Sequence, residues 1–164
     1  GVCNYKAEQL AEAGKYISLA SDQVPYSMVK RDIEKTVVPY CIEHNLSILA
    51  YSPMERGLLT GKLKPGHAFS EGDHRAGLHY FKDENLQRTN AFLDRIKPIA
   101  DSKGLTVGQL VLLWTLAQPG ITIALAGARN KEQAEQNAKA TQAALSANEV
   151  AVITEELSKL QLVK

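Results

Sequence analysis

The sequence has few cysteines, no long apolar run and almost no net charge. Its 164 residues include only Cys3 and Cys41, too few for a disulfide framework, so we expect free thiols in a reducing, cytoplasmic compartment. No apolar stretch reaches the roughly 18 residues that a membrane helix needs, so no membrane span is expected. The formal net charge of +1 argues against bulk nucleic acid or an anionic membrane as a partner.

Metal-ligand patterns are also missing. The four histidines are scattered, and no Cys/His group has the spacing of a metal site: His44, His67, His74 and His79. What is present is an ordinary globular composition, 45% hydrophobic and 23% charged. We therefore expect one domain over 1–164, without a metal and with a sizeable core.

Short apolar runs alternate with amphipathic helical segments along the chain. The patterns predict a strand end at 1–5, helix 6–15, strand 19–23, helix 32–45, strand 46–51, a long loop 54–82, helices 83–103 and 107–117, strand 121–126, a helix from 130 to about 144 and helix 148–160. Pro25 is expected to stop the second strand, and Pro39 marks a kink in the helix around it. Thr106 and Ser146 are predicted helix caps.

This alternation is typical of a parallel sheet, in which ligands sit at the carboxyl ends of the strands. The chemically interesting stretches all fall at such ends, namely Cys3-Asn4, Gln23, Tyr51-Ser52 and Gly127–Arg129. We therefore expect them to share one edge of the sheet.

The last predicted strand, which we expect to be buried, leads into a possible anion site. Gly127 lets the chain turn and approach a ligand, Arg129 adds a permanent charge, and Asn130 begins a helix. Gln133 and Asn137 fall four residues apart on that helix, so both amides could reach one ligand. The pattern suits a phosphate or nucleotide site, and equally an ordinary turn with a surface arginine.

Side chains at the other strand ends suit a nicotinamide dinucleotide. Asn4 and Gln23 each offer an amide that can hold a planar carboxamide, and Tyr51 offers a ring face for stacking. The loop that follows could wrap a diphosphate through Leu58, Gly61 and Lys62. Structural alternatives stay open, because Asn4 could cap the first helix, Gln23 could bond only to backbone, and Tyr51 could be a core residue.

Four motifs stand together in one order: Gly-Val-Cys-Asn-Tyr at 1–5, Gln-Val-Pro-Tyr-Ser at 23–27, Leu-Ala-Tyr-Ser-Pro-Met-Glu-Arg-Gly-Leu-Leu-Thr-Gly-Lys at 49–62, and Ala-Gly-Ala-Arg-Asn-Lys-Glu-Gln-Ala-Glu-Gln-Asn at 126–137. With these motifs the whole chain resembles the aldo-keto reductases, whose fold is a (β/α)8 barrel that binds NADPH in an extended pose. A full barrel takes about 250 residues, and this chain resembles only the C-terminal half, from the end of the fifth strand onward. The resemblance implies an α/β half-barrel of three to four short parallel strands with surrounding helices.

The resemblance also implies roles by position. Asn4 would bond the nicotinamide carboxamide together with Gln23, beside Cys3 where the family commonly has serine, and Tyr51 would stack on the ring. The residues along the diphosphate would be Ser52, Met54, Gly57, Leu58 and Lys62. The adenosine end would be held by Gly127, Arg129, Gln133 and Asn137, with Arg129 pairing with the 2′-phosphate and favouring NADP(H) over NAD.

The family's catalytic Asp, Tyr, Lys and His have no matching positions here, so no catalytic residue is assigned. His79-Tyr80 is a weak candidate for a proton donor, because a tyrosine needs a neighbouring lysine or histidine to lower its pKa for that task. The resemblance implies NADPH-dependent reduction of small aldehydes or ketones, with this chain supplying the cofactor-binding half. The alternative is a nucleotide-binding half-barrel module without turnover.

Half a barrel leaves two open sheet edges and exposes side chains that would fill the barrel centre. We therefore expect self-association, most simply as a twofold homodimer, or pairing with a complementary half-barrel.

Overall fold

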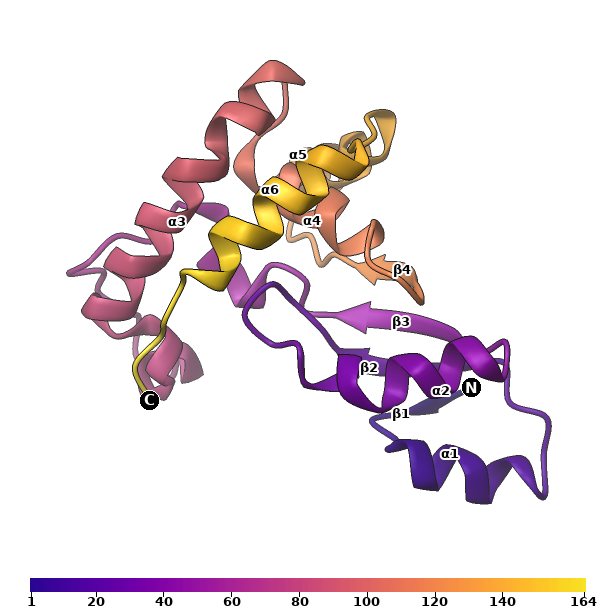
Figure 1. The fold of residues 1–164 in the computed structure, drawn as a ribbon. Helices are drawn as coiled ribbons and strands as arrows, with labels where there is room; N and C mark the ends of the chain where they lie inside the picture. Colours follow the sequence, from indigo (N-terminus) through magenta and orange to yellow (C-terminus); the bar gives the residue numbers. More distant parts are fainter.

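The chain forms a four-stranded sheet with helices packed around it (Figure 1). The computed structural model describes residues 1–164. The strands are β1 (Val2–Cys3), β2 (Ser21–Pro25), β3 (Ser47–Tyr51) and β4 (Ile121–Leu125). The α-helices are α1 (Ala7–Gly14), α2 (Val37–Glu43), α3 (Asp83–Ser102), α4 (Val107–Leu116), α5 (Lys131–Lys139) and α6 (Ala147–Ser158). Short 3-10 helices are η1 (Asp32–Lys35), η2 (Glu55–Thr60), η3 (His74–Gly77), η4 (His79–Phe81) and η5 (Ala140–Gln142).

All strand pairs are parallel, and the strands lie in the order β1-β2-β3-β4, which confirms the predicted parallel sheet. One row of paired residues crosses the sheet through Cys3, Gln23, Leu49 and Ile123. Between Ile48 and Leu49 the register to β4 shifts by one residue. The hydroxyl of the extra residue, Thr122, accepts a hydrogen bond from the Ile48 backbone N–H at 3.3 Å, so this bulge leaves no amide of β3 unpaired there.

The two faces of the sheet differ in burial. The face under the helices is fully buried and carries Asp22, Val24, Ile48 and Ala50. The opposite face is open, because Ile123 is 44% exposed and Leu49 and Gln23 are only partly covered. The expectation of a buried last strand is therefore wrong for β4, in which only Ile121 is buried. Side chains on this open face correspond to those that point to the centre of a closed barrel.

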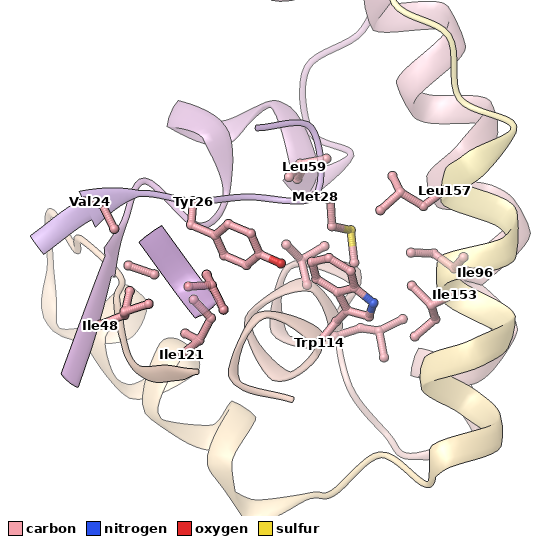
Figure 2. Packing of buried hydrophobic residues seen from close by; sticks show 14 of the residues in the cluster. Val24, Tyr26, Met28, Ile48, Leu59, Ile96, Trp114, Ile121, Ile153 and Leu157 are labelled. Carbon is pink, nitrogen blue, oxygen red and sulfur yellow. The ribbon is translucent and has the colours of Figure 1, made fainter. Parts of the chain in front are cut away.

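The core lies between the sheet and helices α3, α4 and α6 (Figure 2). Trp114 of α4 is fully buried and stacks on Tyr26 with 6.3 Å between ring centroids. Figure 2 shows Ile96 from α3 and Ile153 from α6 on its other side. As its all-round apolar pattern predicts, α4 is buried over most of its length. The core thus joins the sheet to α3, α4 and α6, and it extends to Leu10 of α1 and Cys41 of α2.

The predicted helix at 32–45 is in fact two elements. The backbone of Thr36, with φ −136° and ψ −53°, separates η1 from α2. Pro39 does not kink a helix, because it is the third residue of α2, where backbone N–H groups need no acceptor within the helix. The break therefore comes before the proline rather than at it.

The second strand lies two residues later than predicted and includes Pro25 as its last residue. The N–H of the next residue, Tyr26, bonds to the Tyr51 carbonyl of β3, so the Pro25 nitrogen faces the side of β1. Because β1 has already ended at Cys3, no strand there needs the missing N–H of the proline. The predicted helix caps are confirmed. The Thr106 and Ser146 hydroxyls accept from the third backbone N–H of α4 and α6 respectively.

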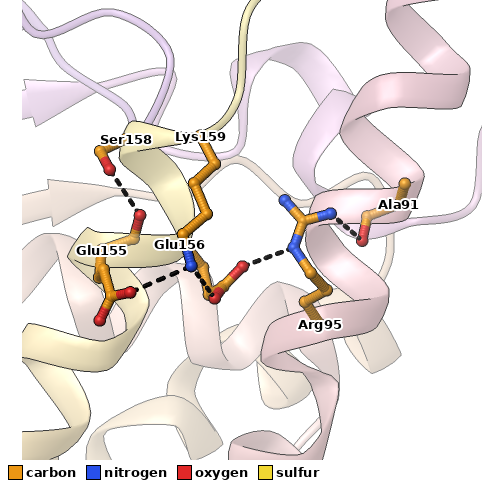
Figure 3. A network of polar contacts seen from close by, with 6 residues as sticks. All are labelled: Ala91, Arg95, Glu155, Glu156, Ser158 and Lys159. Atoms are coloured by element: carbon orange, nitrogen blue, oxygen red, sulfur yellow. Dashed lines mark hydrogen bonds and ion pairs between the residues drawn. The ribbon is translucent and has the colours of Figure 1, made fainter.

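Helices α3 and α6 lie side by side and share a polar network (Figure 3). Arg95 of α3 pairs with Glu156 of α6 at 2.5 Å, and Lys159 pairs with the other oxygen of the same carboxylate at 2.7 Å. These two cations hold the pKa of Glu156 below its ordinary value, Lys159 contributing more. No helix of the structure is both long enough and apolar enough to cross a bilayer.

The C-terminal tail is tied back to α3 by one buried amide. The side chain of Asn85 donates to the Val163 and His79 carbonyls, each at 2.7 Å, and accepts from the Val163 N–H at 2.8 Å. Asn85 thereby joins the tail to the end of the long segment 54–82. That segment has a small core of its own, in which Leu58 packs with Phe81 and Leu86.

Asp22 is an unusual core residue, because its carboxyl group is fully buried between the sheet and α2. One oxygen accepts a long, 3.5 Å hydrogen bond from the Tyr5 N–H, and the other has no partner. Burial raises the pKa of Asp22, although backbone hydrogen bonds from Tyr5 and Gln23 oppose the shift. Burial also raises the pKa of the neighbouring Cys41 thiol to about 11, with the Asp22 charge as a smaller cause.

A raised pKa means that the folded chain keeps a proton which the unfolded chain releases, so the stability from that proton is lost as pH rises above the ordinary value of 3.8. We expect Asp22→Asn to match the native chain below that pH and to have the higher free energy of unfolding at neutral pH. Urea denaturation over an acid-to-neutral pH series measures this. Asp94→Asn, at an exposed position on α3, is the control. A gap between Asp22→Asn and the native chain that stays constant with pH would contradict the assignment.

Candidate functional site

The predicted strand-end residues lie at one edge of the sheet, because all four strands run in parallel (Figure 1). Asn4 and Ser52 follow directly after β1 and β3, and both are non-glycine residues with left-handed backbones, φ 59° and 55°. Such conformations are costly and are often found at functional sites. Gly127 to Arg129 follow β4 at the same edge.

Three of the predicted residues are directly linked. The Tyr51 hydroxyl reaches from β3 across β2 and donates to Oδ1 of Asn4 at 3.1 Å. The Asn4 backbone N–H donates to the Gln23 carbonyl at 2.9 Å. The thiol of Cys3 is exposed in the same row as Gln23. The structure thus brings Asn4, Gln23 and Tyr51 together.

The structural alternatives for these residues do not hold. Helix α1 is capped by Lys6, not by Asn4. The amide side chain of Gln23 makes no hydrogen bond within the chain, and the Nδ2 group of Asn4 makes none either. Tyr51 is half-buried and lies outside the core cluster. Two amides on neighbouring strands therefore present unused donors and an unused acceptor at the sheet edge.

The turn after β3 has an unusual backbone. Glu55, Arg56 and Gly57 have positive φ in succession, at 43°, 54° and 98°. Gly57 fits this conformation without strain, whereas the two residues before it do not. Leu58 is buried in the small core of the long segment, so it can present only its backbone to a ligand. Lys62 is exposed and forms no ion pair, and Met54 is half-buried against Gly108 of α4.

A buried polar contact that the sequence does not reveal positions this turn. The Ser27 hydroxyl, in the loop after β2, donates to the Glu55 carboxyl at 3.0 Å, and both residues are buried. The contact joins the loops after two neighbouring strands across 28 residues of sequence. No local pattern signals it, because each residue alone reads as an ordinary surface polar group.

At the end of β4, Gln133 and Asn137 lie on one face of α5 as expected, but both amides brace the preceding loop. Gln133 accepts from the Arg129 N–H at 2.9 Å, and Asn137 donates to the Gly127 carbonyl at 3.1 Å. Asn130 caps α5 by accepting from the Gln133 N–H at 2.9 Å, as predicted. The guanidinium of Arg129 is exposed and has no carboxylate partner.

The predicted reason for Gly127 is wrong in one respect. Its φ is not positive, so the turn itself does not require glycine. A β-carbon added there would meet nothing within 4 Å, so the position leaves open space beside the loop. Behind the loop lies a hollow of about 300 Å³ between α4, β4 and α5, lined mostly by alanine and leucine. Asn137 is one of its two polar lining residues.

His79 and Tyr80 lie against each other with 4.0 Å between ring centroids. Burial raises the pKa of Tyr80, and the charges of Glu55 and Asp32 add to this shift. A raised pKa makes Tyr80 a weaker acid, which is the opposite of the tuning that a proton donor needs. No three His, Cys, Asp or Glu side chains lie close enough together to hold a metal ion.

Comparison with known proteins agrees with this geometry. A profile of the Aldo/keto reductase family matches residues 1–157. The chain belongs to the aldo/keto reductase family. It is 30% identical to the aldo-keto reductase yakc (NADP(+)) of Schizosaccharomyces pombe, over 99% of this chain and 49% of the relative. It is 29% identical to the NADH-specific methylglyoxal reductase of Escherichia coli, over 98% and 49% respectively.

Solved structures give the same result. The glycerol dehydrogenase AKR11B4 from Gluconobacter oxydans superposes with a TM-score of 0.91 at 30% identity, covering 100% of this chain and 50% of that one. The thermostable aldo-keto reductase Tm1743 gives a TM-score of 0.69 at 26% identity, covering 95% and 47%. The chain spans about half the length of the relatives it matches, so the predicted half-barrel is confirmed.

The Ser27–Glu55 contact yields a stability prediction. Ser27→Ala removes the donor and leaves a buried carboxyl oxygen unsatisfied, so we expect a loss of about 2 kcal/mol in the free energy of unfolding. Urea denaturation at neutral pH measures it. Ser102→Ala, which removes an exposed hydroxyl bonded to the Ile99 carbonyl, should cost less than about 0.5 kcal/mol. Equal losses in the two variants would show that the buried contact contributes nothing specific.

Proposed function

We propose that this chain is the cofactor-binding half of an NADP(H)-dependent aldo-keto reductase that reduces small aldehydes or ketones to alcohols. In this role the four strand ends bind the dinucleotide in an extended pose, nicotinamide at β1 to β3 and adenosine phosphate after β4. The named relatives support a nicotinamide cofactor, since one is described as NADP(+)-linked and another as NADH-specific.

The observation that carries the proposal is the pair of unused amides beside Tyr51. A nicotinamide carboxamide is planar and needs one acceptor and one donor. Because Oδ1 of Asn4 already accepts from Tyr51, Asn4 offers its Nδ2 donors to the carboxamide oxygen, and Gln23 offers its oxygen to the carboxamide nitrogen. The ring of Tyr51 lies at the same edge and suits stacking. Cys3 of β1 and Ser52, which follows β3, lie at the same edge of the sheet.

From these residues the diphosphate and the adenosine would follow the loops at the sheet edge. In the sequence, the turn that contains Met54, Gly57 and Leu58 comes between Tyr51 and Lys62. Lys62 is exposed and would supply a positive charge. The braced loop at Gly127 to Arg129 opens α5, and a helix N-terminus favours an anion. Arg129 is free to form a bidentate pair with a 2′-phosphate, and this favours NADP(H) over NAD(H).

The bound cofactor would supply hydride, while this chain's residues would orient it. Reduction also needs a proton donor for the forming alkoxide. No residue here matches the family's catalytic Asp, Tyr, Lys and His. The pKa of Tyr80 is raised, which makes it a poorer proton donor. We therefore assign this chain binding and orientation, and assign turnover to an assembly that provides the missing groups.

The second candidate is a nucleotide-binding half-barrel module without turnover, favoured by the absence of those four residues. Titrating NADPH into the chain, and then adding an aldehyde without and with a complementary half-barrel, separates the two. Binding without oxidation by the isolated chain fits both functions, whereas oxidation after a complementary half-barrel is added fits only the reductase. Failure of the chain to bind NADPH at all would contradict both.

Arg129 gives the sharpest test of the cofactor choice. We expect Arg129→Ala to weaken NADPH binding about tenfold or more and to leave NADH binding nearly unchanged, because only NADPH carries the 2′-phosphate. Fluorescence titration of both cofactors measures this. The control is Lys131→Ala, which removes a neighbouring exposed cation from α5. Equal losses for both cofactors would remove Arg129 from the 2′-phosphate.

The open sheet face supports the proposed assembly. Strands β1 and β4 each have one unpaired edge in this chain, and Ile123 on the open face is 44% exposed. A second copy of the chain, paired as a homodimer, or a complementary half-barrel would cover both edges and this face.

We expect the chain to sediment as a dimer at micromolar concentration. Ile123→Lys should shift it to monomer, because a charge on the covered face cannot be desolvated cheaply. Val152→Lys replaces a residue of similar exposure, 41%, on α6 and should leave the dimer intact. A native chain that sediments as a stable monomer would contradict the homodimer and leave the complementary half-barrel as the partner.

A further inference from the structure

Arg75, in the long segment, forms more polar contacts than any neighbour in that segment. Its guanidinium pairs with Asp73 through Nε and Nη2, the shortest contact being 2.6 Å. Its third arm, Nη1, donates to the Arg56 carbonyl at 3.2 Å. Asp73 also accepts from the Arg75 backbone N–H at 3.0 Å, so the pair is fixed at both ends.

The pair is well shielded from solvent, with side-chain exposures of 19% for Arg75 and 17% for Asp73. The guanidinium also lies over the ring of Phe69, 5.2 Å from its centroid. Phe69 in turn meets Phe81 edge to face at 5.7 Å. Phe81 packs with Leu58, so the contacts of Arg75 lead into the small core under η2.

The other side of this arrangement is the strained turn after β3. Arg75 bonds to the carbonyl of Arg56, one of two consecutive non-glycine residues with positive φ. A β-carbon added to Gly57 would lie 3.8 Å from Nη1 of Arg75, so the guanidinium covers this turn directly. Strained backbone persists only where surrounding contacts determine it, and here Ser27 bonds to the Glu55 side chain while Arg75 bonds to the Arg56 carbonyl.

We propose that Arg75 is a positioning residue for the cofactor's diphosphate, acting by holding the Glu55–Gly57 turn in its left-handed conformation. This inference rests on the proposed cofactor role of Gly57 and Leu58. Leu58 is buried, so the stretch can offer a diphosphate only its backbone, whose direction the turn sets. Arg75 itself stays paired with Asp73 and does not contact the ligand.

The geometry requires arginine rather than any cation. Two arms of one planar group engage a carboxylate while the third reaches a carbonyl, and the plane lies over an aromatic ring. A lysine ammonium has no planar fork, so it cannot make two parallel bonds to the carboxylate, reach the carbonyl and lie flat over the ring together. The charge alone is therefore insufficient, which distinguishes this role from simple attraction of phosphate.

The test compares Arg75→Ala and Arg75→Lys with Arg88→Ala, which removes an arginine of α3 that pairs with Glu84. Hydrogen exchange follows the Gly57 and Leu59 amides, which both bond to the Met54 carbonyl within the turn. Fluorescence titration gives NADPH affinity in parallel. A third arm adds guanidinium chloride at a low, non-denaturing concentration to Arg75→Ala, with ammonium chloride as the matched salt.

We expect both Arg75 variants to exchange these amides about tenfold faster and to bind NADPH about tenfold more weakly, with Arg88→Ala unchanged. Guanidinium, but not ammonium, should restore both properties to Arg75→Ala. Restoration by a free guanidinium ion also shows that the variant is folded.

Three results would overturn the inference: unchanged exchange in Arg75→Ala, faster exchange with unchanged NADPH affinity, or full function in Arg75→Lys. If the native chain binds no NADPH, the proposed cofactor role falls and this inference falls with it. If the native chain binds NADPH and only the measurements on the Arg75 variants differ from expectation, the cofactor role stands and this inference alone is wrong.

Discussion

Parallel pairing of the four strands in chain order is the constraint on which the rest of the structure depends. It places the carboxyl ends of all four strands at one edge, so loops that are far apart in the sequence lie close together there. Asn4 and Tyr51 are joined by a hydrogen bond only because β2 lies between their strands in register. A slip of one residue in either pairing would turn Gln23 into the helix layer and bring Asp22 out to the open face.

The loops at that edge are positioned by a few polar side-chain contacts. The Ser27–Glu55 hydrogen bond joins the loops after β2 and β3, and Arg75 donates a hydrogen bond to the carbonyl of Arg56. Apolar packing alone would leave this turn free to relax into an ordinary conformation. The sheet thus sets where the loops begin, and a few side chains set their shape.

Local patterns in the sequence were sufficient to predict the element order, the caps at Thr106, Asn130 and Ser146, and the gathering of the candidate site residues at one edge of the sheet. They were insufficient where the outcome depends on distant residues. The exposure of Ile123 depends on what lies across the sheet, which an apolar run does not reveal. The Ser27–Glu55 contact spans two loops, and the break at Thr36 depends on backbone angles that composition does not fix.

The hydrogen bonds that hold the loop at Gly127 to Arg129 affect where Arg129 lies relative to the other end of the candidate site. The side chains that bond to this loop, Gln133 and Asn137, both come from α5, and α5 has no buried residue of its own. The polar tie from α5 to the core is Gln109 of α4, which donates to the Gln136 carbonyl at 2.7 Å. The loop and α5 are therefore held to the core through α4. The position of Arg129 relative to the other strand ends thus depends on how α5 packs against α4.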